Sequence, residues 1–251
     1  MSEYHPFEII PATGKSPILL VCDHATNIVP ASVQGGDLGL PDAEMNRHIA
    51  FDIGARAVTV EMARLLGATA VLSRFSRLVI DPNRGEEDPT LVMKLYDGTI
   101  IPANRHVDQA EVTRRLDSFH RPYHRAITQA LDAMLADGLA PQIISMHSFT
   151  PRLKGREERP WHIGILWDRD DRIVMPLMDA LRADGDIVVG DNEPYSGELR
   201  GDCMYLHGTS RGLPHALIEI RHDLIDDAKG QKDWAARLAK HLSDIILIPE
   251  Q

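Results

Sequence analysis

Residues 16–27 read S-P-I-L-L-V-C-D-H-A-T-N, and they decide the class of fold. The apolar run that ends at Cys22 shows no alternation with polar residues, which is typical of a strand buried on both faces of a sheet. Asp23 and His24 follow at once. Because ligand sites of open α/β sheets lie at the carboxyl ends of strands, we expect functional side chains here.

The segments after this strand favour an α/β fold. Apolar residues recur every three or four positions between Ile49 and Val60, which predicts one amphipathic helix from Pro41 to about Gly67. A second apolar run follows at 68–73. The order strand, helix, strand favours a parallel sheet with right-handed crossovers.

The rest of the chain continues this pattern. An apolar stripe over 110–136, interrupted by Pro122, predicts a kinked helix or two successive helices. Further helices are predicted at about 172–184 and 231–246, and further strands at 142–146, 162–167, 186–189 and 216–220. The economical interpretation is a single domain over residues 1–251, a three-layer α/β/α fold with a doubly wound, mostly parallel sheet. The stretch 82–108 is rich in Pro, Gly and charge and predicts a functional loop.

Composition excludes several classes of protein. A net charge of -10 and a pI near 5.6 give no general attraction to nucleic acid or to anionic membranes. Cys22 and Cys203 are the two cysteines, which excludes a disulfide framework and a C-x-x-C motif. The start of the chain lacks the pattern of a signal peptide, and no apolar stretch approaches the roughly 18 residues of a membrane span. We expect a cytoplasmic protein with neither nucleic acid nor membrane as partner; the sequence does not specify its oligomeric state.

Two histidines stand where an apolar strand gives way to a loop. His24 and His147 suit a catalytic zinc held by two imidazoles and a carboxylate, although each could instead satisfy a local hydrogen bond. A competing pair, His120 and His124, has the i, i+4 spacing of helical ligands. Pro122 lies between them and no H-E-x-x-H glutamate accompanies them, so we expect residues on the surface or behind a site.

Glu219 lies among aliphatic residues in H-A-L-I-E-I-R at 215–221. A carboxylate in such surroundings is either paired with an arginine, such as Arg221 or Arg77, or desolvated so that its proton affinity rises. The second alternative would suit a general base that takes a proton from water.

The stretch S-R-F-S-R-L-V-I-D-P-N-R at 73–84 is rich in groups that bind anions. Its three arginines are Arg74, Arg77 and Arg84. Asn83 and Arg84 together offer a clamp for a substrate carboxylate, and Arg77 could face a developing oxyanion. Asp81 would hold an arginine in place. The alternative is an ion-pair network that stiffens a loop.

Six segments, taken in order, resemble the N-formylglutamate amidohydrolase family. They are V-C-D-H-A-T-N-I-V-P, S-R-L-V-I-D-P-N-R, Y-H-R-A-I, S-M-H-S-F, N-E-P-Y-S-G and I-E-I-R-H-D-L-I. The family is similar to zinc carboxypeptidases and aspartoacylases, so the resemblance implies a zinc-carboxypeptidase-like, doubly wound hydrolase with one zinc per chain.

The resemblance also implies roles for individual residues. His24 and His147 would be zinc ligands, Arg77 would bind the oxyanion, and Glu219 would be the base. The substrate-binding residues would be Asp81, Asn83, Arg84 and Tyr195. Carboxypeptidase-like relatives carry His-x-x-Glu after the first strand, whereas this chain has Asn27 at the last position. We therefore choose Asp52 over Asn27 as the third ligand, because zinc prefers an anionic oxygen to an amide, although an exposed helical carboxylate is the default for Asp52.

The expected function is hydrolysis of the C–N amide bond of a small N-acyl amino acid, with N-formyl-L-glutamate yielding formate and L-glutamate. Zinc would activate water, Glu219 would take its proton, and zinc with Arg77 would stabilise the oxyanion. Two alternatives stay open. One is another N-acyl acidic amino acid or a small peptide as substrate, and the other is a catalytically silent dicarboxylate-binding protein.

Overall fold

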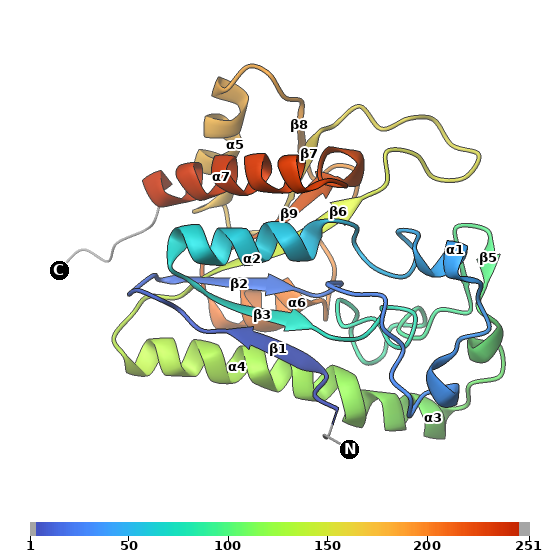
Figure 1. Ribbon diagram of the computed structural model, residues 1–251. Coiled ribbons are helices and arrows are strands. Elements are labelled where there is room, and N and C mark those ends of the chain that lie inside the picture. The colour runs from blue at the N-terminus through green and yellow to red at the C-terminus, as the bar shows by residue number, and fades with distance from the viewer. Residues whose placement is uncertain (1–3, 246–251) are drawn as a thin grey trace.

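The computed structural model describes residues 4–245, and within them a seven-stranded sheet forms the centre of the molecule (Figure 1). The strands lie in the order β1-β3-β2-β6-β9-β7-β8. Their bounds are β1 Phe7–Ile10, β2 Ile18–Cys22, β3 Thr69–Ser73, β6 Gln142–Phe149, β7 Ile163–Leu166, β8 Val189–Asp191 and β9 His215–Arg221. β1 and β7 run antiparallel to β3 and β9, and the other neighbours are parallel. The predicted mixed, mostly parallel sheet is confirmed.

Helices cover both faces of this sheet, which confirms the three layers (Figure 1). α2 (Ala55–Leu66), α5 (Val174–Ala183) and α7 (Ala228–Ile245) pack on one face, whereas α4 (Arg121–Ala136) and α6 (Cys203–His207) pack on the other. The central strand β2 shows why: Leu20 and its alternate neighbours enter the first core, and Leu19 and Val21 enter the second. Every residue of β2 is buried, as its unbroken apolar run predicts.

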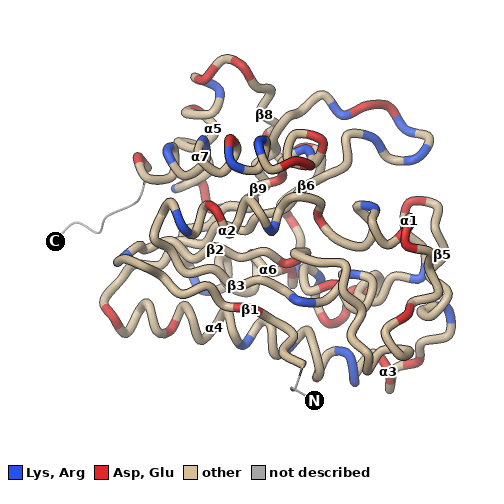
Figure 2. The backbone as a smooth tube through the Cα atoms, viewed as in Figure 1, with Lys and Arg blue, Asp and Glu red and all other residues tan. Residues whose placement is uncertain are grey.

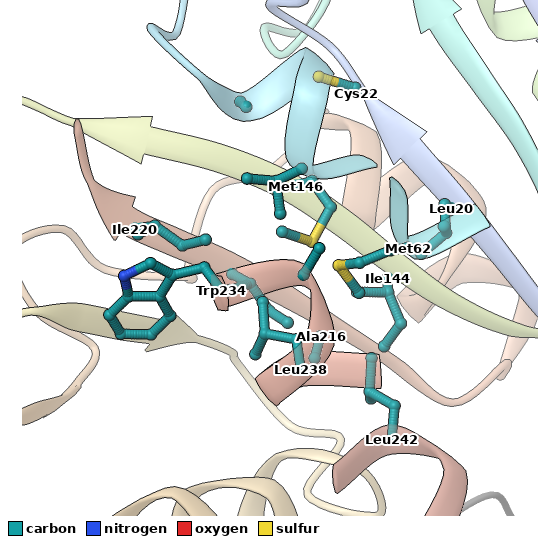
Figure 3. Packing of buried hydrophobic residues seen from close by; sticks show 14 of the residues in the cluster. Leu20, Cys22, Met62, Ile144, Met146, Ala216, Ile220, Trp234, Leu238 and Leu242 are labelled. Atoms are coloured by element: carbon teal, nitrogen blue, oxygen red, sulfur yellow. The ribbon is translucent and has the colours of Figure 1, made fainter. Parts of the chain in front are cut away.

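The core between α2, α7 and the sheet positions two strands that the site uses (Figure 3). Met62 of α2 and Leu238 and Leu242 of α7 lie over Ile144 of β6 and Ala216 of β9. These side chains are almost fully buried. Because the interior is close-packed, the register of β6 against β9 is fixed.

The predicted helix over 41–67 is wrong in its first half. The chain forms the single turn α1 (Asp42–Met45), then irregular backbone, and only then α2. Gly54 ends the irregular segment with φ at 79°, and a Cβ there would lie 2.2 Å from the carbonyl oxygen of Ile225. Asp52 N–H donates to the carbonyl of His24 at 3.0 Å. Asp52 therefore lies in a loop held by tertiary contacts, not on a helix.

The segment 110–136 forms two successive helices, as predicted. α3 (Gln109–Arg115) and α4 are joined by a π-helical turn, Leu116–His120. Pro122 stands in the first turn of α4, where a missing N–H costs no hydrogen bond. This turn places His120 and His124 on the side of α4 that faces the D-P-N-R segment.

The loop over 82–108 contains a small hairpin that was not predicted. β4 (Leu95–Tyr96) and β5 (Thr99–Ile100) pair across Asp97 and Gly98, which have φ values of 43° and 77°. An Asp-Gly pair favours such a turn, so the signal was present in the sequence. β1 and α6 were also not predicted, β8 lies a few residues after its predicted position, and position 246 of the last predicted helix lies outside the described residues.

Short helical turns complete the described elements. They are 3₁₀ turns at Gln34–Gly36, Pro102–Asn104, Thr209–Arg211 and His222–Leu224. Acidic and basic residues are both spread along the chain, and the loop between β6 and β7 carries both kinds (Figure 2). None of the helices within residues 4–245 is long and apolar enough to cross a membrane.

Candidate active site

Two histidines and an aspartate meet at the carboxyl ends of β2 and β6. His24 follows β2, His147 lies near the end of the adjacent strand β6, and Asp52 comes from the loop before α2. Asp52 Oδ2 lies 3.3 Å from His24 Nδ1 and 2.9 Å from His147 Nδ1. All three are buried, and one ligand atom from each lies within 4.8 Å of the others.

The outer nitrogen of each histidine bonds a buried carboxylate. His24 Nε2 lies 2.7 Å from Asp81 Oδ1, and His147 Nε2 lies 3.0 Å from Asp23 Oδ2. Each Nε2–H thus donates outward, and each Nδ1 is left to face Asp52, as in carboxylate–histidine–metal arrangements. Asp23 also accepts from Tyr123 and Ser145. This donor set fits a divalent metal such as zinc, with two imidazole nitrogens and one carboxylate.

Arg77 lies beside the same carboxylates. Its Nη2 donates to Asp81 Oδ2 at 2.9 Å, and its Nη1 lies 3.3 Å from Asp52 Oδ1. The predicted pairing of Asp81 with an arginine is present. The guanidinium also stacks over the Tyr96 ring at 5.5 Å, which holds it in one orientation at the cavity wall.

Glu219 projects from β9 next to His147, its register partner on β6. It is only 7% exposed, and none of the described residues donates a hydrogen bond to its Oε2. Arg221 bonds Asp223 instead, at 2.8 Å. Burial raises the pKa of Glu219 to about 7, against the opposing charge of His147. Of the two alternatives left by the sequence, the desolvated carboxyl is the one observed.

A cavity of about 320 Å³ lies in front of these groups, and three of the predicted substrate residues, Asn83, Arg84 and Tyr195, line it. Asn83 Oδ1 accepts from Cys203 N–H at 3.0 Å, so the amide orientation is fixed. Arg84 Nε is buried, and no acceptor for it occurs within residues 4–245. Tyr195 is 37% exposed at the cavity rim, where its hydroxyl accepts from Arg159 at 3.0 Å.

A model of the family described as N-formylglutamate amidohydrolase matches residues 16–226, which is most of the chain and includes every element of this cavity. The chain belongs to the N-formylglutamate amidohydrolase family.

Relatives and solved structures agree with this membership. A curated N-formylglutamate deformylase of Pseudomonas putida is 28% identical over 135 residues, 48% of this chain and 47% of the relative, so the match spans about half the length of that protein. A crystal structure of a gene product from Agrobacterium tumefaciens is 34% identical with a TM-score of 0.88, and the alignment covers 96% of each chain. N-formylglutamate amidohydrolase from Ralstonia eutropha shares the fold, with 21% identity, a TM-score of 0.72 and coverage of 96% of each chain.

Three residues do not join the site in the way the family resemblance or the arginine cluster implied. Arg74 was expected to bind an anion beside Arg77, but its guanidinium lies over the Tyr4 ring and lines a separate cavity. Asn27, the alternative to Asp52 as third ligand, donates its side-chain amide to Met45 O at 3.0 Å. Asp81 is fully buried behind His24 and Arg77 and is not among the residues that line the cavity.

His120 and His124 support the D-P-N-R segment from behind. His124 Nε2 lies 2.9 Å from Pro82 O, and His120 Nε2 lies 2.9 Å from Arg84 O. His120 is only 2% exposed, so of the two expected positions, on the surface or behind a site, it takes the second. Each residue from 81 to 84 thus has a tertiary hydrogen bond that fixes the clamp segment.

Three titratable residues of the cavity were not predicted from the sequence. They are His48, Tyr96 and Asp202. Tyr96 arrives on the β4–β5 hairpin, for which the Asp-Gly pair was the signal. Asp202 caps α6 by accepting from Tyr205 N–H at 2.7 Å, and burial raises its pKa to about 7. A helix-capping aspartate is common, so nothing in the sequence marks it as a cavity residue.

Proposed function

We propose that this protein is a zinc-dependent amidohydrolase that converts N-formyl-L-glutamate into formate and L-glutamate. One observation carries the proposal: a single cavity brings the His24, His147 and Asp52 donors together with a desolvated carboxyl at Glu219 and guanidinium groups. Family membership supports the same reaction class.

His24, His147 and Asp52 would hold the zinc through Nδ1, Nδ1 and a carboxylate oxygen. A bound zinc supplies Lewis acidity, which lowers the pKa of water toward 7 and polarises the substrate carbonyl. Asp23 and Asp81 keep the Nδ1 lone pairs directed at this position by accepting the Nε2 protons.

Glu219 would move the proton. In this proposal it accepts a proton from the water that attacks the formyl carbon and then delivers it to the amine nitrogen as the C–N bond breaks. The products are formate and the free amino group of glutamate. A carboxyl with a pKa of about 7 suits both steps, because acceptor and donor forms are both populated near neutrality.

Arg77, Asn83 and Arg84 would recognise charge on the substrate. Arg77 is held in place by two carboxylates and would stabilise the oxyanion that forms on the formyl oxygen. Arg84, whose Nε lacks an acceptor within the described chain, and Asn83 would bind a substrate carboxylate. Tyr195 would contact the substrate at the rim.

A longer N-acyl acidic amino acid or a small peptide is a second candidate substrate, because a separate cavity of about 380 Å³ lies next to this one. The two cavities share the wall residues Leu166, Gly197, Leu199, Asp202 and Leu217. A substrate larger than N-formylglutamate could extend past Leu199 into this space.

The test is formate release from N-formyl-L-glutamate by zinc-loaded protein, with N-acetyl-L-glutamate and a γ-glutamyl dipeptide compared in parallel. We expect rapid formate release that a chelator abolishes and that added zinc restores. Faster cleavage of a longer substrate would favour the second candidate. If none of these substrates is cleaved and glutamate binds tightly, the proposal of an enzyme is overturned and the alternative, a dicarboxylate-binding protein, remains.

A further inference from the structure

A second group of metal-binding side chains lies outside the cavity, between α4 and α6. His124 Nδ1 is 2.9 Å from His207 Nε2, and the Cys203 sulfur lies within 4.8 Å of both nitrogens. The two imidazole planes are inclined by only 18°, so the facing nitrogens share nearly one plane. Cys203 and His207 are four residues apart on α6 and therefore share one helical face. Two imidazoles and a thiol are donors typical of zinc and not of magnesium or calcium.

Both imidazole rings of this group are neutral, and His124 Nδ1 offers a lone pair that a cation could bind. His124 Nε2 is next to Pro82 O and donates to it, so the Nδ1 of a neutral His124 carries no proton. Burial lowers the pKa of His124 to about 3 and that of His207 to about 4, so both rings are neutral at pH 7. Without a cation, His207 Nε2–H fills the space by donating to His124.

A third histidine, His120, lies beside this group. Its Nε2 donates to Arg84 O, which leaves a lone pair on Nδ1, and that buried atom has no partner within residues 4–245. Its ring centroid lies 4.4 Å from that of His124. Both histidines line a cavity of about 490 Å³, together with Gly85 and Gly201, whereas Cys203 and His207 do not line it.

We propose that His124 Nδ1, His207 Nε2 and Cys203 Sγ form a second zinc site, separate from the active site. Zinc at about 2.0–2.1 Å from two nitrogens in tetrahedral geometry sets them about 3.3 Å apart. The rings would therefore separate by about 0.4 Å and also tilt, because the two facing nitrogens now point at each other and not at a common third position. Burial and the neighbouring Asp23 raise the pKa of the Cys203 thiol well above its ordinary value, so zinc has to displace a firmly held proton. Binding releases that proton to solvent, and the proton of His207 moves from Nε2 to Nδ1. No oxidation or reduction is involved.

This site would stiffen the segment that carries the substrate clamp. His124 holds Pro82 O from α4, and Cys203 N–H holds the Asn83 side chain from α6. A cation that joins α4 to α6 therefore fixes both supports at once. Its role is to position the clamp, and it does not depend on which substrate the active site cleaves.

The test is metal content and cobalt spectroscopy of the full-length chain. Thiolate bonded to cobalt gives a charge-transfer absorption in the near ultraviolet, and the donors of the active site contain no sulfur, so this band reports on Cys203 alone. We expect two zinc ions per chain for the wild type and a thiolate band after cobalt substitution. Cys203→Ser should retain one zinc and lose the band, whereas Cys22→Ala, which changes the other buried cysteine, should keep both.

His207→Gln serves as a second variant if Cys203→Ser does not fold, and we expect at least about a tenfold loss of affinity for the second zinc with the first retained. One zinc and no thiolate band in the wild type would overturn the proposal, because the group would then be a hydrogen-bonded histidine pair. A band that persists in Cys203→Ser would overturn it as well.

Discussion

Glu219 and Asp202 are both cavity carboxyl groups whose pKa burial raises to about 7. They differ in what their oxygens contact. One Asp202 oxygen caps α6, whereas Glu219 stands next to His147 with an unpartnered oxygen, as far as the described residues show. Since a base must reach the reacting water, Glu219 is the better placed of the two.

Glu219→Gln should lower kcat by about a factor of 10³, because the amide keeps the shape of the side chain but cannot take a proton. Zinc content should be unchanged, since Glu219 is not among the proposed ligands. Asp202→Asn is the matched control, because asparagine caps a helix as well as aspartate does, and it should keep most of the turnover. Equal losses in the two variants would contradict the assignment of the base to Glu219.

Activity should depend on pH through the same carboxyl. Protonated Glu219 cannot act as a base, so kcat/KM should fall about tenfold for each pH unit on the acid side of a midpoint that lies at about pH 7 without metal and lower when the charge of zinc favours the carboxylate. A profile measured from pH 5 to 9 checks this. Its midpoint should stay in place in Asp202→Asn, and a profile that is flat down to pH 5 would count against a base with a raised pKa.

The same pKa predicts a change in stability in the metal-free protein. The pKa of Glu219 rises on folding from 4.5 to about 7, so the stabilisation by its bound proton is complete below pH 4.5 and is lost as the pH rises through 7. The glutamine in Glu219→Gln does not titrate, so the variant does not lose this stabilisation. Between pH 4.5 and pH 8, the free energy of unfolding of the metal-free variant should therefore rise by up to about 3 kcal/mol relative to that of the metal-free wild type. Urea unfolding at the two pH values measures this. If the difference in unfolding free energy between variant and wild type is the same at both pH values, Glu219 is not desolvated.

At the scale of elements, the sequence predicted site residues at the places where a buried strand ends in polar residues. His24, His147 and Glu219 were predicted on that basis, and they meet because β2, β6 and β9 are neighbouring parallel strands. The loop that carries Asp52 was not predictable in the same way. Its apolar residues have helical spacing, and only contacts with distant residues, such as the hydrogen bond from Asp52 N–H to His24 O, prevent a helix.

Gly54→Ala tests how this loop is held. A methyl group would lie 2.2 Å from Ile225 O at a backbone with φ of 79°, so we expect a loss of about 2–4 kcal/mol in unfolding free energy. Gly138→Ala is the control, because its φ of 77° is similar but nothing lies within 4 Å. That variant should cost only about 1 kcal/mol. Similar losses for both would show that the contact with Ile225 does not constrain the loop.

At the scale of the whole molecule, the order of predicted elements was enough for the three-layer α/β class. It was not enough for the arrangement of the outer strands, because β1 and β7 are antiparallel through pairings with residues far away in the sequence. The single domain over residues 1–251 stays a prediction. The proposed zinc joins three distant segments of the fold: the end of β2, the loop before α2, and β6.

Zinc should therefore stabilise the folded chain as a whole. When free zinc is about 100 times its Kd and binds only the native state, it adds about 2.7 kcal/mol to the free energy of unfolding and raises Tm. Thermal unfolding of apo protein titrated with zinc measures this. Asp52→Asn, which removes the anionic oxygen, should weaken the response, and an equal rise in Tm for this variant would place the stabilising metal elsewhere.

Anomalous diffraction at the zinc edge from crystals of zinc-loaded Glu219→Gln with N-formyl-L-glutamate tests the central claim most directly. The account predicts a peak at about 2.0–2.2 Å from Nδ1 of His24, Nδ1 of His147 and a carboxylate oxygen of Asp52, with a substrate carboxylate on Arg84. Absence of that peak, or substrate bound away from Arg84, would contradict it.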